Sequence, residues 1–531
     1  MQRESRIYGP PGTGKTATLT AMVEEAAAEH GADAIMVASY TTAAAEEVAS
    51  RAPSMPEDNI GTLHKFCYHA IGRIPVLEEK KKHIEAWNEF APAYKMNLPG
   101  CKSIDEGLEY GNRDTLGDLL HAETTILRNK LVPRDQWPPN LLAFFELWTQ
   151  FKNDQGGIDY TDMLEIALAD YPEAPGSPQV IFVDEAQDCT TLQFAVLSKW
   201  AEHGEQLVMV GDDDQCIYQF AGAQPDAFGR AERGPNDRVL HQSHRLPFIV
   251  WEHALNWIAR VPDRVDKEYY PVRRADPGFV KSAPFTWKQG EKIADLVMKT
   301  TAKYQSVMVL GACSYMLEPT RKALLAAGIP FHNPYRRIRA DWNPLRPGTG
   351  YSFAQRIAAL FAPSLNPGQT WWTPAQLKAL GAVLGASAAF NKGMKNKLES
   401  DEIKHIDYNV LCRYFNPEAT LAIMGQDLVW WEKHLVNAEA QRKAAYPVKI
   451  VENFGRGFLT VEPNCTLGTI HSIKGAETDV VIIFPDLSVE GMQEWTGKGK
   501  SAIRRLMYVG ITRAREGVFV CRPASPYTTD L

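Results

Sequence analysis

The pattern of apolar and polar residues predicts short buried strands separated by helices. Nearly continuous apolar runs, each bounded by polar or glycine-rich residues, predict strands near 34–38, 180–184, 206–210, 306–314 and 517–522. Helical periodicity follows several of these runs, as in EPTRKALLAAGI shortly after 306–314. Strands that alternate with helices are typical of parallel sheets, so we expect an α/β fold.

Two longer stretches show helical periodicity without strand patterns. The first contains RDTLGDLLHAETTILRNKL (113–131), and the second contains amphipathic segments with a tryptophan core of Trp371, Trp372, Trp430 and Trp431. These stretches divide the chain into two α/β units, each interrupted by a mainly helical insertion. The predicted units are a first core over 1–74 and 158–240, its insertion over 75–157, a second core over 241–339 and 455–531, and its insertion over 340–454.

Composition limits the function without naming it. The 531 residues carry a net charge of −7, so any contact with nucleic acid must rest on local basic residues and backbone donors. The eight cysteines are scattered without a C-x-x-C pair, which is typical of a reducing compartment. The sequence has neither a membrane-length apolar run nor a signal-peptide core, so we expect no membrane partner and a place in the cytoplasm of a bacterium or a virus-infected cell.

A glycine-rich turn between a strand and a helix predicts a phosphate site. Residues 9–16, GPPGTGKT, fit the pattern G-x-x-x-x-G-K-[ST]. Glycines let backbone N–H groups point at phosphate oxygens, Lys15 can reach the β- and γ-phosphates, and the Thr16 hydroxyl can ligate Mg²⁺. The residues expected to bind ATP here are Gly9, Pro10, Gly12, Thr13, Gly14, Lys15 and Thr16.

A second acidic motif predicts the hydrolytic chemistry. QVIFVDEAQD (179–188) is an apolar strand that ends in Asp184 and Glu185. The carboxyl ends of parallel strands meet at the sheet edge where ligands bind. We expect Asp184 to hold Mg²⁺ through water and Glu185 to orient and deprotonate the attacking water.

Further motifs along the chain identify a family resemblance. They are ASYTTAAAEEV (38–48), GTLHKFC (61–67), IDYTDML (158–164), LVMVGDDDQCIYQFAGA (207–223), VLHQSHRLP (239–247), LGTIHSIKGAETDVVIIFPD (467–486) and RRLMYVGITRARE (504–516). In this order, together with GPPGTGKT and QVIFVDEAQD, they resemble the superfamily 1 helicases of the UvrD/Rep/PcrA type, subclass A. One such motif is weak evidence, whereas the ordered series is specific.

The resemblance implies a fold and a catalytic set. The fold is two RecA-like P-loop cores with parallel sheets, each carrying a mainly helical insertion, and ATP lies between them. Gln215 matches the family's γ-phosphate sensor, and Arg245 and Arg513 match its arginine fingers, so the implied catalytic residues are Lys15, Asp184, Glu185, Gln215, Arg245 and Arg513. Glu477 matches a residue that accepts from the ribose hydroxyl, and His244 stands where the family stacks a tyrosine on the base.

The resemblance also implies a path for single-stranded DNA. The positions that match the family's strand contacts are Tyr40, Thr62, His64, Tyr218 and Phe220 on the first core and Thr469 and His471 on the second. Aromatic platforms and polar donors are what a single strand requires. The expected partners are therefore single-stranded DNA and junctions of single- and double-stranded DNA, while a loading, repair or replication protein is left unidentified.

Some positions depart from the family pattern. Only eight residues precede Gly9, so the family's upstream glutamine segment, which reads adenine, is not in this sequence. This leaves three alternatives: the selectivity for the base is relaxed, the start codon lies further upstream than assigned, or another loop takes the place of the glutamine segment. The leading expectation is an ATP-dependent DNA helicase that moves 3′ to 5′ in repair or replication. The alternatives are a single-strand translocase that displaces proteins without robust unwinding, and an ATP-gated DNA-binding module.

Overall fold

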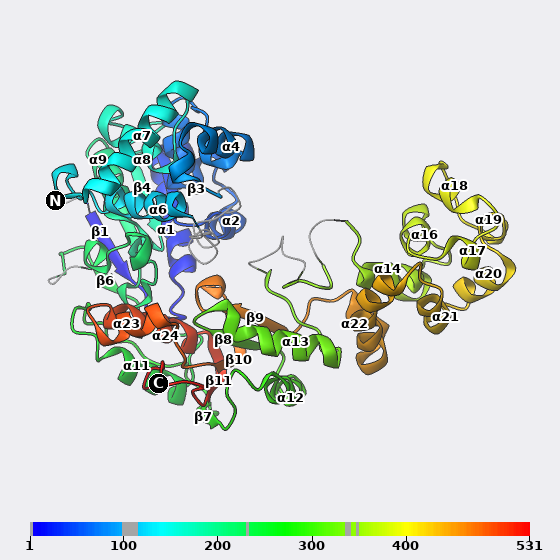
Figure 1. Ribbon diagram of the computed structural model, residues 1–531. Helices are drawn as coiled ribbons and strands as arrows, with labels where there is room; N and C mark the ends of the chain where they lie inside the picture. The colour runs from blue at the N-terminus through cyan, green and yellow to red at the C-terminus, as the bar shows by residue number, and fades with distance from the viewer. Residues whose placement is uncertain (1–3, 98–114, 230–232, 335–340, 347–349) are drawn as a thin grey trace.

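The computed structural model describes residues 4–97, 115–229, 233–334, 341–346 and 350–531. It contains two sheets in which the paired strands run parallel. We call the unit built on the first sheet the first lobe, the unit built on the second sheet the second lobe, and their contact surface the seam. Figure 1 shows the first lobe above the second, with a helical arm extending to one side.

The first sheet has the strand order β3-β2-β4-β5-β1-β6. Its strands are β1 (Glu4–Tyr8), β2 (Ile35–Ser39), β3 (Ile60–Thr62), β4 (Val180–Asp184), β5 (Gln206–Gly211) and β6 (Arg238–Val239). Tyr8 pairs with Gly211 and Ser39 pairs with Asp184, so the loops after β1, β2, β4 and β5 leave the sheet at one edge. This register gathers the predicted ATP motifs.

Helices cover both faces of the first sheet. Buried residues of α1 (Lys15–His30) and α2 (Thr42–Arg51) share one apolar cluster with alternate strand residues such as Val37 and Val208. The intervening strand residues, such as Met36 and Met209, pack with α3 (Leu63–Ala70), α8 (Tyr160–Asp170) and α9 (Thr191–Ala201) on the other face. Strands buried on both faces explain the continuous apolar runs in the sequence.

A helical insertion separates α3 from α8. It contains α4 (Lys81–Phe90), α6 (Leu116–Asn129) and α7 (Pro139–Gln155) around a core that includes Trp87 and Trp148. Asp159, which caps α8, accepts hydrogen bonds from Arg128 of α6 at 2.8 Å and from Lys152 of α7 at 2.5 Å. The IDYTDML motif therefore fastens the insertion to the first lobe.

The second sheet has the order β7-β11-β10-β8-β9. Its strands are β7 (Phe279–Ala283), β8 (Val307–Gly311), β9 (Cys465–Thr469), β10 (Thr478–Ile483) and β11 (Ala514–Cys521). The accompanying helices are α11 (Phe248–Ile258), α12 (Gly290–Thr301), α13 (Glu318–Ala327), α23 (Val489–Thr496) and α24 (Lys500–Ile511). The expected α/β fold with two parallel sheets is confirmed.

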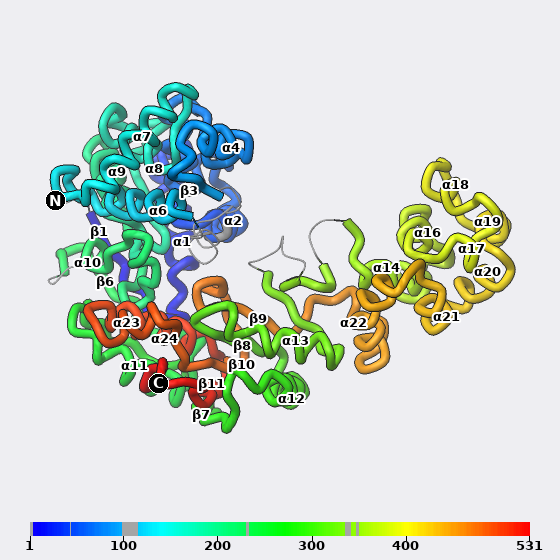
Figure 2. The backbone as a smooth tube through the Cα atoms, viewed as in Figure 1, coloured from blue at the N-terminus to red at the C-terminus, as the bar shows by residue number. Residues whose placement is uncertain are grey.

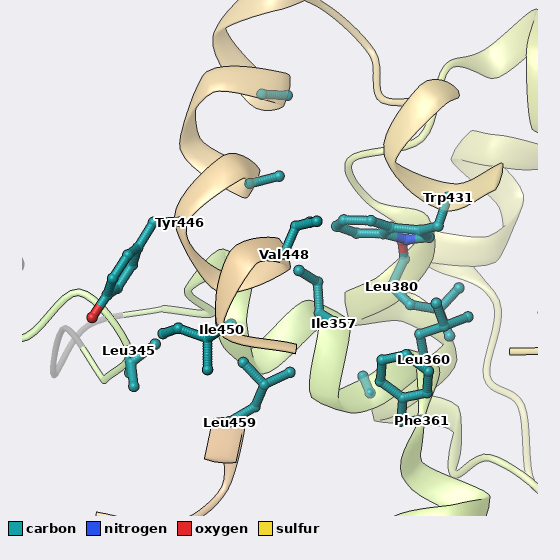
Figure 3. Close-up of a cluster of buried hydrophobic side chains, with 14 of the residues drawn as sticks. Leu345, Ile357, Leu360, Phe361, Leu380, Trp431, Tyr446, Val448, Ile450 and Leu459 are labelled. Carbon is teal, nitrogen blue, oxygen red and sulfur yellow. The ribbon is translucent and has the colours of Figure 1, made fainter. Parts of the chain in front are cut away.

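The helical arm lies between α13 and β9 in the sequence and projects away from both sheets, as Figure 2 shows. It is made of α14 (Phe353–Leu360), α15 (Ala362–Leu365), α16 (Pro374–Gly381), α17 (Ala386–Ala389), α18 (Met394–Ser400), α19 (Tyr408–Tyr414), α20 (Pro417–Met424), α21 (Leu428–Lys433) and α22 (Ala438–Phe454). Trp431 packs near Leu380 in its core (Figure 3), Trp372 and Trp430 are also buried, and Trp371 is partly buried. The predicted start of this insertion at 340 lies outside the described residues. Among the described helices, none combines the length and apolarity that crossing a membrane requires.

Candidate active site

The loop after β1 has the shape of an anion cradle. Gly12 and Gly14 have φ values of +73° and +80°, which glycine adopts without strain, and α1 begins at the next residue, Lys15. The Gly9 amide donates to the Gly211 carbonyl at 2.8 Å, which fixes the loop to β5. Lys15 Nζ donates to the Gly9 carbonyl at 3.1 Å, so its ammonium lies folded over the loop. Phosphate oxygens would meet this ammonium and the first N–H groups of α1.

Two carboxyl groups at the end of β4 have opposite electrostatic surroundings. Burial and the neighbouring Glu185 raise the pKa of Asp184 to about 7, against the pull of Lys15. Burial would also raise the pKa of Glu185, but the charges of Lys15, Lys474 and Arg513 and a hydrogen bond from Gln187 lower it to about 2. Paired carboxyl groups with divergent pKa values are typical of catalytic sites. Glu185 also holds a left-handed backbone conformation, with φ +49°.

Gln187 joins the loops that follow β4 and β5. Its amide nitrogen donates to Glu185 Oε2, and its amide oxygen accepts from the Asp212 amide at 2.9 Å. Gln187 is fully buried, so these contacts orient the predicted base. Gln187 is not among the residues predicted from the sequence, although it stands in the DEAQD motif.

Gln215 and Arg513 meet across the seam. Arg513 Nη2 donates to Gln215 Oε1 at 2.8 Å, and Gln215 Nε2 donates to Asp212 Oδ2 at 2.7 Å. Arg513 is 2% exposed and also donates to the carbonyls of Val509 and Ala476 at 3.0 and 3.2 Å. The guanidinium is therefore held by its own lobe while it touches the glutamine of the other.

The segment 243–245 rests directly on the phosphate loop. The Ser243 hydroxyl donates to the Pro11 carbonyl, and the His244 amide donates to the Gly12 carbonyl, both at 2.8 Å. A Cβ on Gly12 would lie 2.5 Å from Arg245 Cβ, so glycine is required for this approach. The His244 side chain is exposed beside the loop, where a base could stack.

Arg245 lies close enough to Glu185 for that carboxylate to affect its pKa. Burial lowers the pKa of Arg245 to about 10, and the Glu185 charge opposes this shift. Its Nε donates to Glu477 Oε2 at 2.8 Å and its Nη1 donates to the Thr512 carbonyl at 3.2 Å. The other Glu477 oxygen pairs with Arg515, which is not among the residues predicted from the sequence. The structure thus brings Lys15, Glu185, Gln215, Arg245 and Arg513 to one place, and their catalytic roles stay predictions.

Four predicted strand-binding residues form an aromatic cluster, which we define as Tyr40, Tyr218, Phe220 and His471. The rings of Tyr40 and Tyr218 stack with centroids 5.2 Å apart, and His471 lies 5.3 Å from Phe220 and 6.1 Å from Tyr218. Burial lowers the pKa of His471 to about 4. Tyr218 is 2% exposed, so a strand could reach its ring only after the cluster opens.

The remaining predicted strand contacts differ in accessibility. Thr62 pairs with Ser39 across β3 and β2, and its hydroxyl caps α3 by accepting from the Lys65 amide at 3.2 Å. His64 follows in α3, and burial lowers its pKa to about 4. Thr469 is fully buried at the end of β9, where its hydroxyl accepts from the Ser472 amide at 3.3 Å.

Comparison with known proteins agrees with these motifs. Residues 1–235 match the family described as "UvrD/REP helicase N-terminal domain". The "Probable DNA helicase II homolog" of Rickettsia felis is 22% identical, over 97% of this chain and 89% of that protein. The ATP-dependent DNA helicase UvrD2 of Mycobacterium bovis is 24% identical over 96% of this chain and 75% of its own. The ATP-dependent DNA helicase srs2 of Schizosaccharomyces pombe is 25% identical, over 50% of this chain and 34% of that protein.

Proposed function

The chain belongs to the UvrD/Rep-like helicases of superfamily 1, and from this membership we propose that it is an ATP-dependent motor that moves 3′ to 5′ along single-stranded DNA and unwinds duplex. The observation that carries the proposal is the contact of Arg513 with Gln215 across the seam, beside Glu185 and the phosphate loop. A nucleotide at this seam would touch both lobes. Its hydrolysis would then change how the lobes are held together.

In the proposed reaction, Glu185 accepts the proton of the attacking water. Its lowered pKa keeps it ionised at neutral pH, and Gln187 fixes one of its oxygens. Negative charge that develops on the γ-phosphate oxygens is offset by Lys15, Arg245 and Arg513. Gln215 positions Arg513 from the first lobe, so the catalytic set is complete only when the lobes are in contact.

Thr16 and Asp184 would hold the Mg²⁺ that accompanies ATP. Asp184 is 3% exposed, and burial with the adjacent Glu185 raises its pKa to about 7. A divalent cation at this carboxyl would favour its ionised form, so the residues suit the ion. Bound there, Mg²⁺ supplies positive charge to the β- and γ-phosphates.

We further propose the domain division given by the sequence, with a first core over 1–74 and 158–240 and a second core over 241–339 and 455–531. The strands β1–β6 and β7–β11 fall within these ranges. The aromatic cluster bridges the two cores, since Tyr40, Tyr218 and Phe220 come from the first and His471 from the second. This position supports single strands and single- to double-strand junctions as substrates.

The test is steady-state ATP hydrolysis with and without single-stranded DNA, followed by unwinding of 3′- and 5′-tailed duplexes. The proposal expects strong stimulation by the single strand and unwinding of the 3′-tailed duplex. Stimulation without strand separation would favour a translocase that displaces proteins. If the rate of hydrolysis is the same with and without DNA, and ATP changes only the affinity for DNA, the protein is an ATP-gated binding module. That result would contradict the proposed motor function.

A further inference from the structure

Lys474 crosses the seam from the loop after β9. Its side chain is only 10% exposed, and its ammonium pairs with Asp188 of the first lobe. The same Nζ donates to the Gln215 carbonyl at 2.8 Å. Asp188 lies in the turn that begins with Glu185, and Gln215 contacts Arg513, so both partners of Lys474 belong to elements of the candidate active site.

The Lys474 ammonium also faces the aromatic cluster. Nζ lies 5.1 Å from the centroid of the Tyr218 ring, within the range of a cation–π contact. Tyr218 stacks on Tyr40 and lies beside His471. A single charge therefore contacts the loop of the predicted base on one side and the predicted strand-binding rings on the other.

The electrostatic effects of Lys474 agree with this double placement. Its charge is the largest influence after that of Lys15 in lowering the pKa of Glu185, while burial acts in the opposite direction. It also adds to the effect of burial in lowering the pKa of His471. Displacement of the ammonium would therefore change the electrostatic surroundings of Glu185 and of His471 in the aromatic cluster at the same time.

We propose that Lys474 is a positioning residue that couples occupancy of the aromatic cluster by single-stranded DNA to the arrangement of the ATP site. The proposal rests on the proposed function. A strand that enters the cluster must part Tyr218 from its neighbours, which removes the ring from the ammonium. Lys474 then keeps its contacts with Asp188 and the Gln215 carbonyl, and these draw the second lobe onto the turn that carries Glu185.

The experiment compares Lys474→Met with Lys474→Arg, using exposed Lys299→Met on α12 as the matched control. The readout is the ratio of kcat with saturating oligo-dT to kcat without it, together with KM for ATP. We expect Lys474→Met to lose about tenfold of the stimulation, the usual size of coupling between two sites, with KM changed less than about threefold. Lys474→Arg keeps the charge and should recover most of the ratio. A ratio of stimulated to unstimulated kcat in Lys474→Met equal to that of the wild type would overturn the proposal.

A double-mutant cycle with Asp188→Asn breaks the same contact from its other side, so the test does not depend on Lys474→Met alone being folded. Asp188→Asn removes the carboxylate while Lys474 keeps its charge, and we expect the double variant to be no worse than the poorer single variant, because both act through one contact. Additive losses would overturn the inference. Failure of wild-type hydrolysis to respond to oligo-dT would instead contradict the proposed function, so the two failures are distinguishable.

Discussion

Replacing Lys267 with methionine should loosen the contact between the loop that follows β5 and the segment between α11 and β7. Lys267, between α11 and β7, has a side chain that is 1% exposed and pairs with three carboxylates, Asp212, Asp213 and Asp214. Its Nζ lies 2.8 Å from Asp212 Oδ1 and 2.9 Å from Asp214 Oδ2. Methionine keeps the length of the side chain and removes the charge.

The free-energy cost of the substitution follows from the buried carboxylates that it leaves without the Lys267 charge. Burial would raise the pKa of Asp214, but Lys267 and Arg264 outweigh it and lower that pKa to about 2. Removing one partner of a buried ion pair costs about 3–5 kcal/mol, because the remaining charge is left buried. At about 1.4 kcal/mol per factor of ten, local opening should become about 150- to 4,000-fold more frequent.

Native-state amide hydrogen exchange measures this opening segment by segment. Protection of 206–217 and 263–270 should fall in Lys267→Met and stay unchanged in the exposed control Lys299→Met. The lowered pKa of Asp214 gives stability that is present above its ordinary value of 3.8 and lost as the pH falls toward 2. In the variant the carboxyl groups take up protons more readily, so its stability deficit relative to the wild type should shrink as the pH falls. A change in protection below about threefold at pH 7 would refute the reasoning.

Other outcomes follow from the same geometry. Glu185→Gln should bind ATP with nearly wild-type affinity in an equilibrium titration and lose about 10²- to 10⁴-fold in turnover, and near-normal turnover would remove Glu185 as the base. Gly12→Ala should lower the thermal unfolding midpoint more than Gly14→Ala, because both have positive φ but only at Gly12 does a Cβ approach Arg245, at 2.5 Å; equal midpoints would argue against the close approach. His471, whose pKa burial lowers to about 4, should titrate by NMR well below its ordinary 6.5, so its contribution to stability is full above 6.5 and lost as the pH falls toward 4; a midpoint above 6 would show that it is accessible.

Local sequence was sufficient for several of the strands and for the phosphate loop. The runs near 180–184 and 206–210 correspond to β4 and β5 within a residue, because strands covered on both faces must be apolar throughout. The helix expected after the phosphate loop is α1, which ends at His30 just before Gly31. These features depend on neighbours in the sequence.

Contacts between distant segments could not be read in this way. The run of acidic residues in GDDDQ looks like a solvated turn, yet it is buried because Lys267, more than fifty positions later, supplies the opposite charge. Lys474 stands in the quoted IHSIKGAE stretch, but its partner Asp188 is 286 positions away. The position of Tyr218 in the sequence also does not indicate that its ring stacks on the ring of Tyr40. Pairings of this kind are set by how the lobes pack, which no periodicity encodes.

The most direct measurement is a structure of the protein with Mg²⁺ and a non-hydrolysable ATP analogue. We expect the γ-phosphate to lie within hydrogen-bond distance of Lys15, Arg245 and Arg513, with Glu185 facing it and Arg245 released from Glu477. A nucleotide held by the phosphate loop alone, with both guanidinium groups turned away from it, would rule out a catalytic role for Arg245 and Arg513.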